Sequence, residues 1–308
     1  MAKQKITVRS AGKNVRPEPF QVEYLHPDIP IFASEETLEH TDNVFNSSHF
    51  HDEFEWIRVL SGTLQFEVNG EEKLVQKGET LFINSRQVHI FYGCPEGSAV
   101  FRVLLAKPDF IRNPCIGKQL ARMIQDPRFS SVIIRPVNPL FSADMDAILE
   151  LSRNKPQAYE FSVLSHYLEQ LRQIIRIYEH ANPDETIRRN TDIDSLREMM
   201  AYIGEHYQEP ISLDELAAAG KMSRSKCTKL FRQYVQQSPV EHIQNYRLER
   251  CIYLLNNTDM TCAEIAMNCG FNEQSYFNRL FLRKFNMSPK KMREQHRRRN
   301  RSASQKQR

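Results

Sequence analysis

Two related stretches govern how the last third of the chain folds: SLDELAAAGKMSRSKCTKLF (212–231) and TCAEIAMNCGFNEQSYFNRLF (261–281). Their corresponding residues lie 49 to 50 positions apart, and a Ser-Pro pair follows each stretch. The same pattern of apolar and polar residues predicts the same local structure, so the chain builds one unit twice.

Each copy begins with the signature of a helix start. Ser212 with Glu215, and Thr261 with Glu264, are capping boxes, in which side chain and backbone N–H satisfy each other. Three further landmarks correspond, namely a turn glycine, an N-cap residue and the end of a second helix: Gly220, Ser223 and Val235 in the first copy, and Gly270, Asn272 and Phe285 in the second. Each copy is therefore predicted to be a helix-turn-helix.

A further helix is predicted between the copies. Pro239 is suited to the first helical position of the segment PVEHIQNYRLERCIYLLNN (239–257). The apolar side chains of this segment can pack against both copies: Ile243, Tyr246, Leu248, Ile252 and Leu255. We expect a rigid unit in which the separation of the two copies is fixed.

The second helix of each copy has an apolar and a polar face. Three residues of each must turn inward to make a core: Cys227, Leu230 and Phe231, and Phe277, Leu280 and Phe281. The outward faces then carry Ser225, Lys226, Thr228, Lys229 and Arg232, and Gln274, Ser275, Asn278, Arg279 and Arg283. An ordinary solvated helix has such a face too, but Arg and Lys also reach guanine acceptors, and Asn and Gln pair with adenine. The duplication favours DNA binding.

The charge distribution agrees with this interpretation. From Ser195 onward there are 20 Lys and Arg against 11 Asp and Glu, a formal charge of +9, whereas the remainder of the chain carries −5. A basic region of this kind is common in nucleic-acid-binding proteins. The tail RRRNRSASQKQR (297–308) adds six cations, either as a disordered arm with non-specific affinity or as a solvated end.

Residues 195–295 resemble the DNA-binding domain of AraC/XylS-type transcription regulators. The most specific match is EIAMNCGFNEQSYFNRLFLRKFNMSPKKMR (264–293), and the first copy, RLER (247–250) and the Ser-Pro endings also match. The resemblance implies a seven-helix domain whose two second helices enter successive major grooves. It implies base contacts from Ser225, Thr228, Lys229, Gln274, Ser275, Asn278 and Arg279, and phosphate contacts from Lys226, Arg232 and Arg283.

The first third of the chain has a strand-like pattern. Short β-branched and aromatic runs such as LQFEV (64–68) occur between about Phe20 and Leu105. Asn69-Gly70 directly after that run is a strong signal for a type I′ hairpin. We expect a β-barrel or sandwich.

A polar motif lies inside this strand-rich region. HFHDEFEWIRVLSG (49–62) has the spacing H-x-H-x3-E-x6-G, which resembles the first motif of the cupin barrels. The odd numbering of His49, His51 and Glu55 places them on the same side of an extended strand, so we expect them to converge inside a barrel.

A second cupin-like motif follows. The family pattern G-x5-P-x-G-x2-H is matched from Gly78 to His89, with Asn84 and Arg86 in place of the Pro and the second Gly. Three imidazoles and a carboxylate in these motifs could bind a divalent metal such as Fe, Mn, Ni or Zn: His49, His51, His89 and Glu55. The resemblance to AraC-type regulators favours a metal-free pocket instead, in which these residues orient a small effector between apolar residues such as Phe66 and Phe91. Incidental polarity of strand residues is the third interpretation.

Between about Cys115 and His180 the apolar period becomes helical. One face of a long predicted helix carries Phe161, Leu164, Leu168, Leu171, Ile174, Ile175 and Tyr178. This face packs on its own β-domain or forms a subunit interface, and its length favours a share in dimerisation. The polar stretch ANPDETIRRNTDID (181–194) is predicted to be a linker.

These patterns predict a multidomain α and β protein with five segments. They are a cupin-like β-barrel sensing domain (1–112), a helical dimerisation segment (113–180), a linker (181–194), an all-α DNA-binding domain with two helix-turn-helix motifs (195–296) and a basic disordered tail (297–308). No apolar run is long enough for a membrane helix, and the amino terminus lacks the apolar centre of a signal peptide. Six cysteines without a C-x-x-C pair suit reduced thiols in a cytoplasm.

The sequence predicts a ligand-responsive transcription regulator with no catalytic residues and no required cofactor. Its expected partners are double-stranded DNA, a small-molecule effector such as a sugar or related metabolite, RNA polymerase and a second copy of the chain. By family analogy it more often activates than represses. The alternative is a metal-dependent cupin enzyme fused to a DNA-binding domain.

Overall fold

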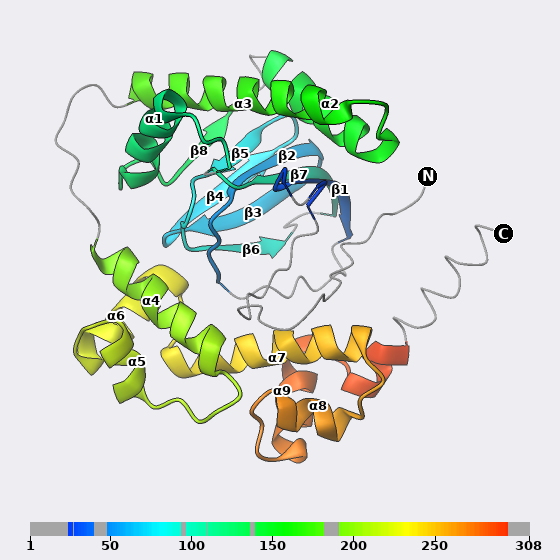
Figure 1. Cartoon of the computed structure of the whole chain (residues 1–308). Helices are drawn as coiled ribbons and strands as arrows, with labels where there is room; N and C mark the ends of the chain where they lie inside the picture. The colour runs from blue at the N-terminus through cyan, green and yellow to red at the C-terminus, as the bar shows by residue number, and fades with distance from the viewer. Residues whose placement is uncertain are drawn as a thin grey trace. The chain divides into compact units, whose positions relative to one another are not determined.

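The computed structural model describes residues 24–26, 28–39, 48–93, 97–108, 110–135, 139–181 and 191–294 (Figure 1). These residues divide into two compact units: the N-terminal unit ends at Asp194 and the C-terminal unit begins at Ser195. Among the described residues, no helix combines the length and apolar character needed to cross a membrane.

The N-terminal unit contains two antiparallel sheets. Its strands are β1 (Ile31–Glu39), β2 (Phe54–Ser61), β3 (Thr63–Val68), β4 (Glu71–Gln76), β5 (Thr80–Ile83), β6 (His89–Gly93), β7 (Ser98–Ala106) and β8 (Ser131–Ile134). One sheet has the order β1-β7-β2-β5-β8 and the other β4-β3-β6. Residues 69 and 70 of the β3–β4 hairpin have φ of 50° and 83°, so the predicted turn with two left-handed residues is confirmed.

The two faces of β2 belong to different cores because side chains alternate along a strand. Phe54 and Trp56 pack in the cluster that the sheet forms with the helices. Ile57 and Val59 belong to a second cluster, to which β3 contributes Leu64 and its neighbours. Strands of both sheets thus enclose the second cluster, as in a cupin fold.

Three helices cover the outer face of the five-stranded sheet: α1 (Pro114–Gln125), α2 (Pro139–Asn154) and α3 (Tyr159–Ala181) (Figure 1). Met123, Ile148 and Tyr167 of these helices are fully or almost fully buried in the cluster with Trp56. The indole of Trp56 meets the ring of Tyr167 edge-on, at 6.1 Å between centroids. This packing holds the helices on the sheet.

The apolar stripe predicted on α3 divides between two environments. Leu171, Ile174 and Tyr178 are buried against the unit's own core, as one of the two interpretations expected. Phe161 and Leu168 are 78% and 40% exposed. The helix therefore packs on its own domain with part of the stripe and presents the rest outward.

Helices extend into both ends of the predicted linker (181–194), although the two compact units meet at its predicted end, between Asp194 and Ser195. Ala181 is the last residue of α3, and α4 (Thr191–His206) begins four residues before the predicted boundary. Ile193 is 3% exposed, and Asp192 and Asp194 in the first turn interact favourably with the positive end of the helix dipole. These features favour a helix start that the polar composition of the stretch concealed. Residues 182–190 lie outside the described residues.

The C-terminal unit is entirely helical in its described part. After α4 come α5 (Leu213–Ala219), α6 (Arg224–Val235), α7 (Pro239–Asn257), α8 (Cys262–Asn268) and α9 (Gln274–Phe285), and residues 289–294 are helical as well. Both capping boxes, the start of α7 at Pro239 and the ends of α6 and α9 are confirmed. The predicted basic tail, 297–308, lies outside the described residues.

One cap prediction was wrong. The residue before α9 is Glu273 rather than Asn272, and its side chain makes no capping hydrogen bond. The first helices of the copies are offset by 49 residues and the second helices by 50, so the turn of the second copy is one residue longer. This insertion moves Asn272 out of the capping position that Ser223 occupies in the first copy.

Candidate functional site

The helices α6 and α9 turn the predicted apolar residues inward. Cys227, Leu230 and Phe231 of α6 are at most 1% exposed, and Phe277, Leu280 and Phe281 of α9 at most 6%. The opposite faces are thereby fixed in direction. Each helix end is closed by a left-handed residue, Gln236 or Asn286.

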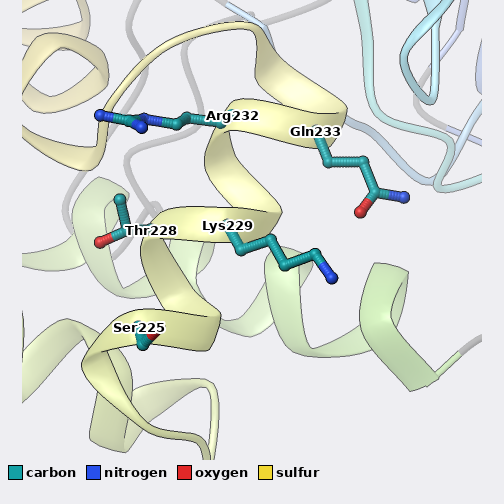
Figure 2. Close-up of a pocket in the computed structure, with 5 residues that line it drawn as sticks. All are labelled: Ser225, Thr228, Lys229, Arg232 and Gln233. Atoms are coloured by element: carbon teal, nitrogen blue, oxygen red, sulfur yellow. The ribbon is translucent and has the colours of Figure 1, made fainter.

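The outward face of α6 lines a concave region. Ser225, Lys229 and Arg232 are exposed and Thr228 is half-buried. With Gln233 they line a pocket of about 580 Å³ (Figure 2). Figure 2 shows Thr228 and Arg232 along one edge of the helix and Lys229 and Gln233 along the other.

Gln233 is a residue that the sequence analysis missed. Its position four residues after Lys229 places both side chains on one edge of α6, and this spacing was the available signal. Lys226, which was predicted on a phosphate, is exposed but does not line this pocket. The structure thus gathers four of the five predicted residues of α6 around one concavity.

All five predicted residues of α9 are exposed: Gln274, Ser275, Asn278, Arg279 and Arg283. The guanidinium of Arg279 lies 5.5 Å from the ring centroid of Tyr276, in cation–π contact. Gln244 Nε2 of α7 donates a hydrogen bond of 2.8 Å to the hydroxyl of that tyrosine. The chain Gln244–Tyr276–Arg279 therefore links the outward face of α9 to α7.

The connecting helix α7 contacts both copies, through α6 and α8. It is also tied to the end of α4: Arg247 donates 2.7 Å hydrogen bonds to the carbonyls of Tyr207 and Glu209. Ile243, Tyr246, Leu248 and Leu255 are buried as predicted, whereas Ile252 is only half-buried. These contacts connect α4 and both copies through α7.

In the N-terminal unit, the four residues of the cupin-like motifs come together. Ligand nitrogens of His49, His51 and His89 lie within 4.8 Å of one another. Glu55 Oε2 lies 3.2 Å from His89 Nε2 and 3.6 Å from His51 Nε2. The predicted convergence is observed.

The expected single extended strand was wrong for the histidines. The strand β2 begins at Phe54, so Glu55 lies on it, while His49 and His51 precede a bend at residues 52–53. His49 is instead paired with His89 through two backbone hydrogen bonds of 3.0 and 2.9 Å. Backbone pairing across the two motifs, rather than side-chain alternation in one strand, assembles the cluster.

The two departures from the second cupin motif are accommodated by the backbone. Arg86 takes the position of the family's glycine and has a φ of 61°, and its N–H donates to the carbonyl of His51 at 2.8 Å. Asn84 is buried and donates to the carbonyls of Met123 and Phe129 at 3.0 and 2.8 Å. These hydrogen bonds fix the backbone of the turn and thereby help to position His51 and His89.

The electrostatics of the cluster follow from burial and from its mixed charges. Burial alone would lower the pKa of His51, but the neighbouring carboxylates of Glu53 and Glu55 raise it to about 10. Burial alone would raise the pKa of Glu55, but His51 and His89 hold it below its ordinary value. Glu53 also accepts a hydrogen bond from Tyr24, and its pKa falls to about 2 despite burial.

The donor set fits either of two occupants. His51 Nδ1, Glu55 Oε2 and His89 Nε2 are buried and make no hydrogen bond of good geometry. Imidazole nitrogens and a carboxylate are ligands for a divalent cation such as Zn or Fe, and they equally bond hydroxyls of an organic molecule. Phe66 and Phe91 stack at 4.8 Å in the apolar cluster between the sheets.

Comparisons with known proteins agree with both units. Residues 216–295 match the helix-turn-helix domain family, and residues 38–105 match the cupin domain family. The uncharacterized HTH-type transcriptional regulator YdeC of Bacillus subtilis (strain 168) is 25% identical over 272 residues, covering 85% of this chain and 91% of its own. The HTH-type transcriptional activator RhaS of Klebsiella pneumoniae (strain 342) is 25% identical over 252 residues, covering 80% and 87%.

A solved structure shows the same two-domain fold. ToxT from Vibrio cholerae strain SCE256, with an unsaturated fatty acid bound, has a TM-score of 0.53 at 12% sequence identity and covers 85% of this chain and 94% of that chain. At this identity the likeness shows the fold alone.

The fold and the matched domains define a helix-turn-helix transcription regulator with an N-terminal cupin-type domain. The predicted resemblance to AraC/XylS-type transcription regulators and the predicted fold class are confirmed. Its cupin-type unit is the ligand-binding domain of that architecture.

Proposed function

We propose that the chain regulates transcription by placing α6 and α9 in successive major grooves of its operator. The observation that carries this proposal is the repeated outward face: two helices of one compact unit turn apolar residues inward and polar, cationic residues outward. Base contacts come from Ser225, Thr228, Lys229, Gln274, Ser275, Asn278 and Arg279. Lys226, Arg232 and Arg283 bind phosphates.

Selection of binding sites from randomised DNA by the full-length chain tests this function. We expect one enriched sequence with two protected segments about one helical turn apart. Lys226→Ala should weaken binding to selected and scrambled DNA alike and reduce the salt dependence, since a phosphate contact carries no sequence information. Failure to enrich any sequence would contradict the proposal.

The N-terminal unit, in this proposal, senses a small effector through His49, His51, Glu55 and His89. Their buried polar atoms can orient hydroxyl groups, which suits a sugar or related metabolite. The fatty acid bound to ToxT concerns that protein, but it makes an amphipathic effector a second class to screen. A divalent metal is the competing occupant, held by the same four residues.

Two measurements separate these occupants. Glu55→Ala should abolish the effect of an added effector on transcription while DNA affinity without effector stays within about threefold, since operator contacts lie in the other unit. Lys73→Ala on β4, where the lysine pairs with Glu71 at 2.9 Å, is the matched control and should change neither. Elemental analysis that finds near-stoichiometric metal after dialysis would overturn the metal-free pocket.

A metal-dependent cupin enzyme is the second candidate, favoured only by the cluster of three imidazoles and Glu55. A metal there would act as a Lewis acid on a bound oxygen. A sensor binds its effector without turnover, so product formation in a substrate screen distinguishes the two functions. The relatives named as transcriptional regulators support the non-enzyme interpretation.

We propose further that the regulator works as a homodimer. The exposed residues of α3, Phe161 and Leu168, lie seven residues apart on one edge of the helix and offer an apolar seam to a second copy. Phe161→Glu should convert a dimer to a monomer in sedimentation, whereas Glu160→Gln beside it should not. A wild-type monomer at micromolar concentration would contradict this seam.

The remaining proposals concern regulation and domain limits. The activator name of RhaS supports activation through RNA polymerase in the cytoplasm, which a reporter assay with purified polymerase tests directly. The domain limits that we propose are a sensing domain (1–112), a helical dimerisation segment (113–180), a linker (181–194), a DNA-binding domain (195–296) and a basic tail (297–308). The boundary between the two compact units, at Asp194 and Ser195, supports the start of the DNA-binding domain.

A further inference from the structure

The outward face of α9 carries one apolar residue that the phosphate and base contacts above do not use. Leu282 is 53% exposed and lies outside the buried stripe of Phe277, Leu280, Phe281 and Phe285. It follows Asn278 by four residues, so the two side chains lie on the same edge of the helix. An isolated exposed leucine is unremarkable by itself, but this one lies on a face proposed to enter the major groove.

The equivalent position in the first copy shows how unusual the side chain is. The helices α6 and α9 correspond at an offset of 50, so Leu282 occupies the place of Arg232. Figure 2 shows Arg232 on the same edge of α6 as Thr228, whose counterpart is Asn278. A cation that can bind phosphate in one copy is replaced in the other by a side chain that can form no hydrogen bond.

The apolar group that a duplex presents in its major groove is the 5-methyl of thymine. The neighbours of Leu282 favour DNA over a protein partner as its contact, because Arg279, Arg283 and Asn278 are exposed beside it and make the surface cationic and polar. We propose that Leu282 reads a thymine methyl in the operator half-site bound by α9. This inference rests on the DNA-binding function proposed above and names a base that the site must contain.

The position of that thymine follows from helix geometry. Four residues advance the chain about 6 Å along an α-helix, and base pairs are about 3.4 Å apart along the duplex. The thymine therefore lies within about two base pairs of the base that Asn278 contacts. Because Asn pairs with adenine N6 and N7, we expect an adenine and a thymine close together under α9.

The test uses full-length protein and the site that it selects from randomised DNA. Each thymine of that site is replaced in turn by deoxyuridine, which removes the methyl group and nothing else. For wild-type protein, one replacement under α9 should weaken binding about three- to tenfold, as expected for the loss of one buried apolar group. Leu282→Ala should bind the thymine site more weakly by a similar factor and lose its sensitivity to that replacement.

Two control variants keep the result interpretable. Met267→Ala removes an even more exposed apolar side chain, on α8, and should leave the deoxyuridine profile of wild type unchanged. Leu282→Arg copies the first helix-turn-helix and should gain affinity for selected and scrambled DNA alike, with a steeper salt dependence. Circular dichroism verifies that each variant is folded.

The outcomes also separate this inference from the proposed function. If no sequence is selected, the DNA-binding function itself fails. If a site is selected but no thymine methyl matters, or if Leu282→Ala keeps the wild-type sensitivity, the function stands and the role of Leu282 is overturned.

Discussion

The two helix-turn-helix copies have almost the same backbone and different outward faces. Both first helices begin with a capping box, and both second helices contain 12 residues. The turn between the two helices differs. Its left-handed residue is Lys221 in the first copy and Gly270 in the second, and the turn of the second copy is one residue longer. Repetition has therefore preserved the support more strictly than the surface that it presents.

The faces differ in chemistry position by position. Three corresponding pairs, at an offset of 50, show the change, with the residue of α6 first: Lys226 and Tyr276, Thr228 and Asn278, Arg232 and Leu282. The face of α6 is cationic, whereas that of α9 adds an amide, an aromatic ring and an apolar side chain. We infer that sequence specificity resides mainly in the second copy.

The largest expected difference is in the turns. A Cβ on Gly270, which has a φ of 77°, would lie 2.5 Å from the carbonyl oxygen of Tyr207, and backbone cannot easily move away. Gly270→Ala should destabilise the second copy by about 2–4 kcal/mol. A Cβ on Gly220 would meet only the flexible side chain of Met199, at 2.8 Å, so Gly220→Ala should cost about 1 kcal/mol or less.

Hydrogen exchange of peptides from α6 and α9 in full-length protein measures these two effects separately. The glycine variants should each raise exchange in their own copy, and Gly270→Ala by far the more. Equal protection of α9 in both variants would show that the turn of the second copy can relax. It would contradict the prediction that the two turns differ in their tolerance of a side chain.

The second largest expected difference is the loss of stability of the two copies at acid pH. His242 of α7 is 1% exposed beside Phe231, and burial lowers its pKa to about 4. The unfolded chain takes up this proton near pH 6.5, so the folded state loses up to about 3 kcal/mol as the pH falls from 6.5 towards 4. Above pH 6.5, the neutral form of His242 predominates in both folded and unfolded chains, so this loss of stability is absent.

The second copy supplies its own control for this pH effect. Met292 occupies the corresponding position, four residues after Ser288 of the second Ser-Pro pair, and its side chain has no titratable group. His242→Met should flatten the loss of α6 protection between pH 6.5 and 4 and leave α9 unchanged. An unaltered acid profile would mean that other groups cause the loss.

Base readout gives the third contrast. Arg279→Ala should cost about 1–3 kcal/mol on the selected site and little on scrambled DNA, because an arginine that reads guanine discriminates between sequences. Lys229→Ala, its counterpart, should cost about 1 kcal/mol or less on the same site. Titration of labelled duplexes at fixed salt measures both, and equal losses of Arg279→Ala on both DNAs would place that residue on a phosphate.

Local patterns in the sequence were enough to predict the helical unit. A capping box is a contact within four residues, and the inward stripe of each second helix follows from its own period, so Ser212, Phe231 and Phe281 behave as predicted. The Asn69-Gly70 turn is equally local. The convergence of His51 and Glu55 was predicted from the motif spacing, although the extended strand assumed for it is interrupted by a bend at residues 52–53.

The predictions that failed depend on features without a local signature. Asn272 is not the cap because the turn of the second copy contains one additional residue. The alignment of the two copies gave an offset of 49 to 50 residues and did not locate this insertion. The start of α4 depends on burying Ile193, and the bend before β2 depends on pairing His49 with His89. Gln233 and Tyr276 enter the site through contacts that only the folded chain reveals.

The smallest expected effect concerns Tyr276, for which the first copy has Lys226. The ring lies under the guanidinium of Arg279, and Gln244 fixes its hydroxyl, so we expect it to hold the arginine in a limited set of conformations before DNA binds. Tyr276→Leu should weaken binding to the selected site about two- to fivefold, which is about 0.5–1 kcal/mol, with no change on scrambled DNA. Tyr276→Phe, which keeps the ring, should lose less.

A double-mutant cycle decides whether the tyrosine acts through the arginine. In an Arg279→Ala background, Tyr276→Leu should have no further effect on binding, because the group that it positions is gone. Additive losses would mean that Tyr276 contacts DNA itself. Tighter binding by Tyr276→Leu would show instead that the ring withholds Arg279 from the groove, and the second copy would then owe its specificity to Asn278 and its neighbours rather than to a pre-positioned arginine.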